Sequence, residues 1–354
     1  MAALFIAGMR LNFSGISVRL ISEAVMKKIC IFILTVLAVL CFTAATVQAS
    51  PISRNGRLSV AGGKIVNEEG RPFVIKGVST HGINWFPEYV SRASFRSLKK
   101  DWGANTVRLA LYTEGYNGYC SGGSRSGLRK LIENGVSYAA QEGMYAIIDW
   151  HILSDGNPKK YLKQSTAFFA HMAKKYRNSS NVIYEICNEP NGSGGTWRNI
   201  RTYSKKLIST IRKYDKKAII IVGTPTWSQD IENAAALPLK GKNLAYAFHF
   251  YSGTHKASMR ARLETALKNK VPVIVSEFGI SAASGNGGVY RSEGDRWITL
   301  LDRYKTGRVC WNLSNKNESS ALLKSGCSRL SGWKKSDLSA EGKWLVKSYR
   351  GKLS

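Results

Sequence analysis

Short apolar runs alternate with longer amphipathic runs along most of this 354-residue chain. Eight apolar runs have the length and the Val and Ile content of strands that are buried on both faces: 73–79, 105–111, 144–150, 182–187, 218–222, 244–250, 271–276 and 308–313. Eight runs with helical periodicity follow them in turn: 91–101, 125–142, 158–177, 196–214, 229–236, 257–269, 290–306 and 339–349. Strict alternation predicts a parallel sheet, and eight units are the number that closes a (β/α)8 barrel. We therefore expect one α/β domain, a TIM barrel, with a short β-hairpin over residues 57–72 in front of it.

The first 50 residues have the pattern of an export signal. Met26-Lys27-Lys28 is a positive start, residues 29–40 are an apolar run, and Val47-Gln48-Ala49 is a small-residue cleavage site. The apolar run is shorter than the ~20 residues that a membrane span requires, which disfavours a retained anchor. We expect 1–25 to be an upstream extension or a mis-assigned start and 26–49 to be a signal peptide. Residues 50–354 would then be the secreted domain, extracellular or periplasmic, with no membrane association after signal removal.

Four cysteines remain in residues 50–354: Cys120, Cys187, Cys310 and Cys327. Export would place them where disulfides persist, so one or two disulfides are compatible with the sequence. Cys187 and Cys310 lie in expected strands, where they also fit the pattern of small buried apolar residues. The cysteine spacing lacks the paired pattern of a zinc site, so we expect no metal ion.

The chain is strongly basic, with a formal net charge of +29. Such a charge is typical of proteins that bind nucleic acid or an anionic surface. The Lys and Arg residues are spread along the chain, often on expected outer helix faces such as Lys174-Lys175 and Lys205-Lys206, and no recognition motif accompanies them. We therefore expect a basic, solvated exterior and no nucleic-acid partner. Adhesion to an acidic wall or matrix polymer is the functional alternative.

Two of the expected strands run into a glutamate. Residues 183–190 read Ile-Tyr-Glu-Ile-Cys-Asn-Glu-Pro, so that Glu189 follows one strand, and residues 271–279 place Glu277 at the end of another. Because the carboxyl ends of barrel strands meet at one mouth, the two carboxyl groups are expected to converge there. A pair of positioned carboxyl groups is the catalytic set that most glycosidases use to cleave a glycosidic bond.

The other strand ends carry polar or aromatic residues that would suit the same cleft. A purely structural core would place Val and Leu there, whereas a sugar site needs an Arg and an Asn to fix its acids and aromatic faces to stack on pyranose rings. The residues at or just after the strand ends are His81, Trp85, Arg108, Tyr112, Asp149, Trp150, His151, Asn188, Thr226, Trp227, His249, Tyr251 and Trp311. Within this set, Asp149 and Trp150 are interpreted as packing or supporting groups. Glu185, which lies in the middle of its strand, is interpreted as a structural partner inside the barrel.

Four segments together resemble glycoside hydrolase family 5, a family of retaining (β/α)8 glycosidases, over about residues 57–350. They are Ile183-Tyr-Glu-Ile-Cys-Asn-Glu-Pro-Asn191, Thr226-Trp-Ser-Gln-Asp230, Ser276-Glu-Phe-Gly279 and Trp311-Asn-Leu-Ser-Asn-Lys-Asn-Glu318. Within the family the chain is most similar to bacterial endo-β-1,4-glucanases (cellulases). The resemblance implies Glu189 as the proton donor and base and Glu277 as the nucleophile. It also implies five residues that keep the nucleophile charged, hold the sugar 2-hydroxyl or orient the acid and substrate: Arg108, Tyr251, Asn188, His151 and His249.

The resemblance implies glucan-binding positions as well. On the non-reducing side these are His81, Trp85, Tyr112, Trp311, Lys316 and Glu318. Trp227 corresponds to an aromatic residue on the leaving-group side, and Ala283 and Ser284 to loop positions that touch the sugar. Phe86 stands where relatives often have Tyr, which removes one polar contact.

The signal segment predicts a secreted enzyme, and because two acids can perform all the proton and covalent steps we expect no cofactor. We also expect a monomer whose partner is a polysaccharide. A hydrolase of the same fold that acts on mannan, mixed-linkage β-glucan or xyloglucan is the alternative of the same class. A non-catalytic polysaccharide- or nucleic-acid-binding protein is the alternative of another class. The joint presence of Glu189, Glu277, Arg108, Asn188 and Tyr251 argues against it, since a binding module does not need all five.

Overall fold

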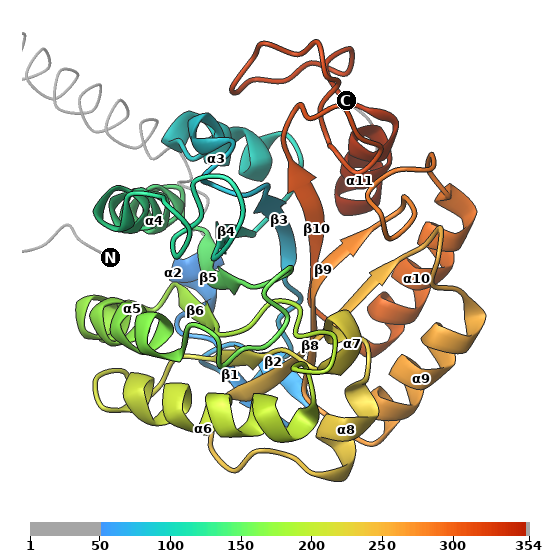
Figure 1. Ribbon diagram of the computed structural model, residues 1–354. Helices are drawn as coiled ribbons and strands as arrows, with labels where there is room; N and C mark the ends of the chain where they lie inside the picture. Colours follow the sequence, from blue (N-terminus) through green and yellow to red (C-terminus); the bar gives the residue numbers. More distant parts are fainter. Residues whose placement is uncertain (1–50, 352–354) are drawn as a thin grey trace, which may run out of the picture. The chain divides into compact units, whose positions relative to one another are not determined.

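The computed structural model describes residues 51–351 and shows a closed barrel of eight parallel strands (Figure 1). The strands are β3 (Lys76–Thr80), β4 (Thr106–Tyr112), β5 (Tyr145–His151), β6 (Val182–Glu185), β7 (Ile220–Val222), β8 (Leu244–Tyr251), β9 (Val273–Gly279) and β10 (Arg308–Leu313). They pair in chain order, and β10 closes the barrel against β3. The predicted (β/α)8 fold is therefore confirmed.

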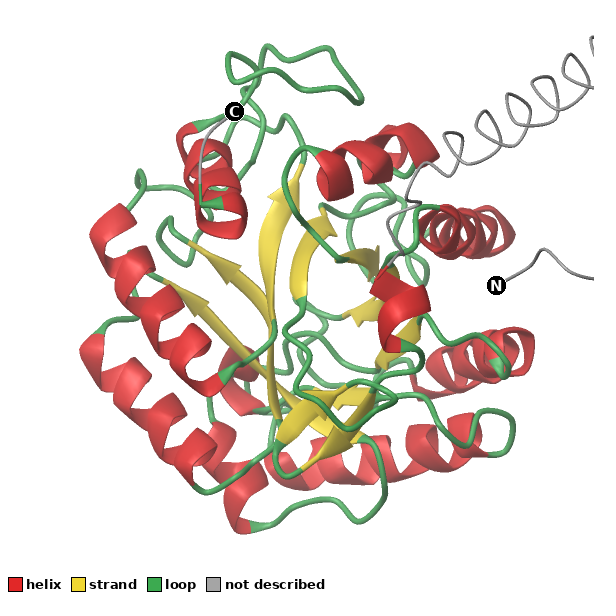
Figure 2. Ribbon diagram, turned by 180° about the vertical axis from the view of Figure 1, so that it is seen from behind, coloured by secondary structure: helices red, strands yellow, loops and turns green. Residues whose placement is uncertain are grey.

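Helices surround the strands on the outside (Figure 2). The eight expected helices are present as α3 (Arg92–Lys100), α4 (Arg125–Gln141), α5 (Leu162–Tyr176), α6 (Trp197–Arg212), α8 (Ile231–Ala236), α9 (Ala257–Lys268), α10 (Arg291–Tyr304) and α11 (Ala340–Arg350). Three short segments were not expected from the sequence: α2 (Pro51–Asn55), η1 (Pro87–Tyr89) and α7 (Pro225–Ser228). The expected segments 1–25 and 26–49 lie outside the described residues. Among residues 51–351, no helix combines the length and apolar character that a bilayer span requires.

Hydroxyl side chains fix where several helices begin. The side chains of Ser91, Ser124, Thr196 and Ser339 each accept a hydrogen bond from a backbone N–H in the first turn of α3, α4, α6 and α11. These bonds satisfy donors that have no partner within the helix. Each bond therefore fixes the end of a segment that leads from a strand to the following helix.

The predicted hairpin is present as β1 (Ser59–Ala61) and β2 (Lys64–Val66). Its Leu58 and Ile65 pack against Tyr145, Ile147 and Ile219, which point into the barrel near its amino end. The hairpin therefore closes the end of the barrel that is remote from the strand carboxyl ends.

Alternate residues of each strand face opposite sides, and this alternation separates packing from chemistry. In β4, Val107, Leu109 and Leu111 join the apolar layer between strands and helices, whereas Arg108 points into the barrel and meets carboxylates there. Trp150 of β5 packs outward against Phe168 and Phe169 of α5, which confirms its predicted packing role.

The four cysteines among the described residues are unpaired, so the disulfides that export would have permitted do not form. Cys187 and Cys310 are fully buried, which confirms their interpretation as small core residues.

A second buried acid lies behind the end of β9. Glu341, in the first turn of α11, is fully buried, and its Oε1 accepts a hydrogen bond from the backbone N–H of Ile280 at 2.8 Å. Burial raises the pKa of Glu341 well above its ordinary value, and the hydrogen bond only partly opposes that effect. The side chain is therefore a neutral acid that ties α11 to the segment following Glu277.

Replacing Glu341 by Gln keeps the acceptor oxygen and removes the titrating proton. The folded protein holds this proton, whereas the unfolded chain releases it above about pH 4.3. The unfolding free energy of the wild type therefore falls as the pH rises from the unfolded-state pKa of Glu341 to its raised folded-state pKa. We expect Glu341→Gln to gain stability over the wild type by about 1.4 kcal/mol per pH unit in the window, measured by urea unfolding. The exposed Glu88→Gln is the control, and an identical pH dependence for all three proteins would contradict the buried neutral acid.

Candidate active site

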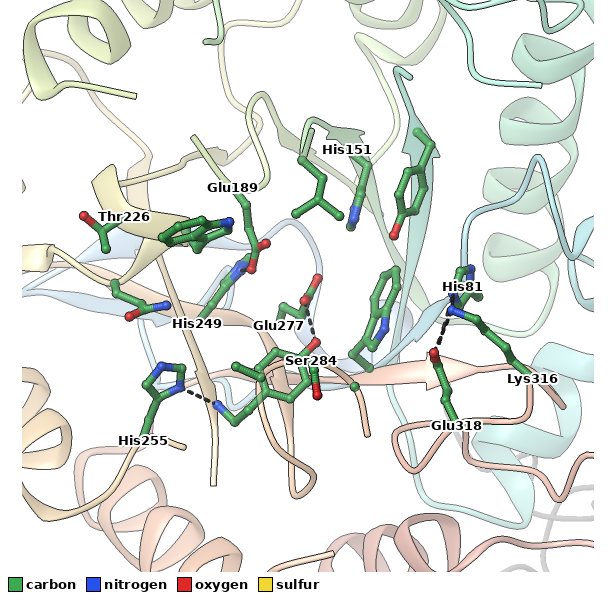
Figure 3. Close-up of a pocket in the computed structure, with 18 residues that line it drawn as sticks. His81, His151, Glu189, Thr226, His249, His255, Glu277, Ser284, Lys316 and Glu318 are labelled. Carbon is green, nitrogen blue, oxygen red and sulfur yellow. Dashed lines mark hydrogen bonds and ion pairs between the residues drawn. The ribbon is translucent and has the colours of Figure 1, made fainter. Parts of the chain in front are cut away.

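The carboxyl ends of the strands surround an open cavity (Figure 3). Its volume is about 520 Å³, within the usual range for ligand sites. The residues that line it come from strand ends and the segments that follow: His81, Tyr112, His151, Leu153, Glu189, Thr226, Trp227, Gln229, His249, Tyr251, His255, Glu277, Ala283, Ser284, Gly285, Trp311, Lys316 and Glu318. Both glutamates singled out from the sequence face this cavity.

Glu189 and Glu277 approach each other closely. One oxygen of each carboxyl group and one ring nitrogen of His249 all lie within 4.8 Å of one another. Carboxyl groups about 5–5.5 Å apart are typical of glycosidases that retain the anomeric configuration, whereas inverting enzymes need about 6.5–9.5 Å to admit a water. The separation favours the retaining arrangement.

Glu277 is held in its ionised form. Its Oε2 accepts a hydrogen bond from Nη1 of Arg108 at 3.0 Å, and its Oε1 accepts one from the hydroxyl of Tyr251 at 2.7 Å. Burial alone would raise the pKa of Glu277, but the charges of His249 and Arg108 outweigh it and hold the pKa below its ordinary value. An ionised carboxylate is what a nucleophile requires.

Glu189 has the opposite electrostatic environment. Burial, reinforced by the negative charge of Glu277, raises the pKa of Glu189 to about 7. Its Oε1 lies 2.9 Å from Nδ1 of His249, which limits the rise without cancelling it. A protonated carboxyl group beside an ionised one gives the pair an acid and a nucleophile.

His249 is fixed from its other side. Its Nε2 lies 3.0 Å from the hydroxyl of Ser276, which in turn donates to Oε1 of Glu185 at 2.7 Å. Burial would lower the pKa of His249, but its interactions with Glu185 and Glu189 raise it to about 9. The imidazolium therefore donates through Nδ1 to Glu189 and through Nε2 to Ser276.

Arg108 connects three of the buried acids. It donates from Nε to Glu185 at 2.7 Å and from Nη1 to Glu277, and its Nη2 lies 3.1 Å from Oδ2 of Asp149. Burial disfavours the charge, yet the three carboxyl groups raise the pKa of Arg108 above its ordinary value. The predicted supporting positions of Asp149 and Glu185 are confirmed, since both lie beneath the cavity and contact Arg108.

Asn188 is held on both sides of its amide. Its Oδ1 accepts a hydrogen bond from Arg108 at 2.6 Å, and its Nδ2 donates to the carbonyl of Ile152 and lies 3.2 Å from Nε2 of His151. The latter contact assigns Nε2 as an acceptor, so the His151 proton is on Nδ1, which donates to Asp149 at 2.7 Å. Burial, aided by the charge of Arg108, lowers the pKa of His151 to about 3, so this ring is neutral.

Aromatic rings form one wall of the cavity. Trp311 stacks on His151 with 5.1 Å between ring centroids, and Tyr112 lies 4.1 Å from His151. At the far end Lys316 pairs with Glu318 at 2.6 Å, near His81 (Figure 3). Rings and charged groups placed in this way offer both stacking faces and hydrogen-bonding partners to a chain of sugars.

Trp227 lies at the opposite end and is 43% exposed. Thr226, Trp227 and Ser228 of α7 all have φ between 54° and 57°, the left-handed region that side chains rarely adopt. The turn is held by hydrogen bonds to the Asn188–Pro190 segment, from Trp227 N to the carbonyl of Pro190 and from Ser228 Oγ to the carbonyl of Asn188. This strained turn therefore aims Trp227 at the cavity next to Glu189.

Four of the sequence-predicted residues do not line the cavity. Arg108 and Asn188 lie beneath it, behind the glutamates. Trp85 packs on Tyr112 with 4.6 Å between ring centroids, and Phe86 contacts the ring of His81 edge-on. A direct contact of Trp85 or Phe86 with sugar stays a prediction.

Sequence reasoning did not name four of the lining residues as site candidates: Leu153, Gln229, His255 and Gly285. His255 accepts a hydrogen bond from the backbone N–H of Tyr251 through Nδ1 at 2.9 Å, and so fixes the residue that contacts Glu277. Ser276, the buried polar residue before Glu277, was also missed as a support for His249. The hydroxyl of Ser276 in a mostly apolar run could have indicated a polar role inside the barrel. His255 lies in a loop, where no periodic pattern indicates its position.

Comparison with known proteins relates the whole barrel to one family. The family model described as cellulase (glycosyl hydrolase family 5) matches residues 66–317. Endoglucanase A of Butyrivibrio fibrisolvens is 43% identical over 294 residues, which are 82% of this chain and 68% of that protein. Endoglucanase N of Pectobacterium atrosepticum is 42% identical over 92% of this chain and 72% of its own length. The solved catalytic domain of endoglucanase Cel5A of Thermobifida fusca, in complex with cellotetraose, superposes with a TM-score of 0.81 at 34% identity, covering 85% of this chain and 99% of that one.

The raised pKa of Glu189 gives a direct test of the charge coupling between the two glutamates. Glu277→Gln removes a neighbouring negative charge, so the pKa of Glu189 should fall from about 7 towards the ordinary value of about 4.3. The pKa is measured by NMR of 13C-labelled glutamate carboxyl groups over a pH series. Glu318→Gln, at the far end of the same cavity, is the matched control and should leave it unchanged. If the pKa of Glu189 does not fall in the Glu277→Gln variant, the charge coupling between the two glutamates is contradicted.

Proposed function

The chain belongs to the cellulase family, glycosyl hydrolase family 5, and is an endo-β-1,4-glucanase; on this premise we propose that Glu189 and Glu277 perform a two-step retaining hydrolysis. The observation that carries the proposal is the pair itself. Two carboxyl groups with oxygens within 4.8 Å of each other have pKa values shifted in opposite directions. Such a pair supplies an acid and a nucleophile at the same pH.

In the first step, the Glu277 carboxylate attacks the anomeric carbon of the sugar that lies over it. Glu189 gives its proton to the glycosidic oxygen, so the bond to the leaving chain breaks as the glycosyl ester forms. Arg108 and Tyr251 hold the two Glu277 oxygens in place. Tyr112 and Trp311 offer stacking surfaces to the sugars on the non-reducing side of the cleaved bond. Trp227 offers a stacking surface to the leaving chain on the other side.

In the second step, the ester of Glu277 carries no negative charge. The charge that helped to raise the pKa of Glu189 is therefore lost, and His249 still donates to Oε1 of Glu189. Both effects lower the pKa of Glu189, so it stays ionised after giving up its proton and accepts a proton from the incoming water. The water attacks the anomeric carbon from the face that the leaving chain vacated, the ester bond breaks to release the Glu277 carboxylate, and the original configuration is restored.

We further propose that residues 26–49 direct export and are removed, and that residues 50–354 act outside the cytoplasm as a single catalytic domain. All the residues assigned to the reaction come from one chain, which is compatible with a monomer. The polysaccharide substrate follows from the family.

The two glutamate roles are distinguished by a pair of matched variants. Glu189→Ala lacks the proton donor, so kcat/KM on cello-oligosaccharides should fall by about 10²–10⁴-fold. An aryl cellobioside whose leaving group needs no proton should still form the ester, and added azide should release it as the β-glycosyl azide. In Glu277→Ala, azide takes the place of the nucleophile and should give the α-glycosyl azide. The same azide anomer from both variants, or undiminished turnover by either, would overturn the assignment.

A further inference from the structure

Acidic and basic residues are distributed unequally between the inside and the outside of this protein. Between residues 156 and 217 the sequence contains 14 Lys and Arg residues and three acidic residues. The three acids are Glu185, Glu189 and Asp215, and all are buried, with exposures of 0, 8 and 0%. The first two belong to the catalytic cluster. This stretch therefore presents basic side chains to solvent and no carboxylate of its own.

Within this stretch, most of the basic residues lie on two neighbouring helices. Helices α5 and α6 pack side by side on the outside of the barrel (Figure 1). With their C-terminal caps they span 162–177 and 197–213, where the sequence has six Lys, four Arg and no acidic residue. We call these ten residues the basic flank. Lys163, Lys174, Lys205, Lys206 and Lys213 of the basic flank are all exposed.

Residues elsewhere in the fold neutralise little of the charge of the basic flank. Within the described part of the chain, Lys175 is its one member that forms an ion pair, with Glu133 of α4 at 3.2 Å. The opposite flank, formed by α9 and α10, is built differently. There, arginines such as Arg260 and Arg262 pair with Glu293, Asp230 and other acids. One side of the barrel is therefore balanced in charge and the other is not.

From this asymmetry we propose that the basic flank is a docking surface for a carboxylate-bearing polysaccharide, such as a polyuronate, that accompanies the glucan substrate. Residues three or four positions apart on a helix have Cβ atoms about 5–6 Å apart, a spacing of the order of one sugar unit. Arg198, Arg201 and Lys205 form such a series on α6. A chain of regularly spaced carboxylates can meet such a series with several charges at once.

The two helices of the basic flank lack the exposed aromatic rings on which proteins stack the bases of single-stranded nucleic acids. The aromatic residues of α5 and α6, Phe168, Phe169, Tyr176, Trp197 and Tyr203, are all buried.

Docking on the basic flank is separate from catalysis. The flank lies on the outer helices, and none of its residues lines the cavity. Because exposed charges are screened over about 8 Å at physiological salt, the attachment is weak and reversible. It holds the enzyme near its solid substrate without occupying the cleft. Docking would therefore be the function of the excess positive charge.

The test compares two variants with the same change in net charge. The flank variant carries Lys174→Glu, Lys205→Glu, Lys206→Glu and Lys213→Glu. The control variant carries Lys240→Glu, Lys334→Glu, Lys335→Glu and Lys347→Glu, all exposed positions outside the basic flank. Binding to immobilised polygalacturonate is measured at about 50 and 150 mM salt, with neutral dextran as the blank. We expect the flank variant to lose about tenfold or more in affinity at the lower salt and the control about twofold or less.

Both variants should cleave a neutral cello-oligosaccharide with the wild-type kcat/KM, so failure of docking is distinguishable from failure of the catalytic proposal. Equal loss of binding in both variants would show that only net charge acts, and would overturn the docking surface. Wild-type binding to double-stranded DNA or to anionic lipid vesicles that is tighter than binding to polygalacturonate, and that is lost in the flank variant, would overturn the polyuronate as the partner.

Discussion

A buried positive charge organises the catalytic end of this barrel. Burying an ion costs several kcal/mol, and Arg108 is fully buried; Glu185 and Glu277 offset that cost by accepting its hydrogen bonds at 2.7 and 3.0 Å. His249 adds a second cation next to Glu185. Two cations thus face two carboxylates of lowered pKa, and Glu189 beside them is the member of the catalytic pair whose pKa rises. The division between acid and nucleophile follows from this balance.

The barrel makes such a concentration of charge possible because each strand separates its two faces. In β8, Phe248 and Phe250 pack outward in the apolar layer, whereas the alternate residues His249 and Tyr251 line the cavity. The apolar layer supplies stability, which leaves the inward positions free for chemistry. The exterior shows the consequence. Several acidic residues are buried in the barrel, and the outer helices have an excess of lysine and arginine.

The sequence predicted the barrel because its signals are local. Runs of Val and Ile mark the strands, hydroxyl residues such as Ser91 and Thr196 mark helix starts, and Glu189 and Glu277 stand where apolar runs end. The rest depends on tertiary contacts. The left-handed turn at Trp227 is held by the segment after β6, the packing of Trp85 on Tyr112 is set by loop geometry, and His255 has no periodicity to reveal it. Disulfides that composition permitted do not form among the described cysteines.

The central claim is that Glu277 forms a covalent bond to the sugar while Glu189 moves the proton. The most direct test follows the anomeric configuration of the first product by 1H NMR during rapid hydrolysis of a β-1,4-cello-oligosaccharide, before mutarotation. The close approach of the two carboxyl groups predicts that the β-anomer appears first and the α-anomer only later. Initial release of the α-anomer would contradict the account, because it requires direct attack by water and a wider separation of the two acids.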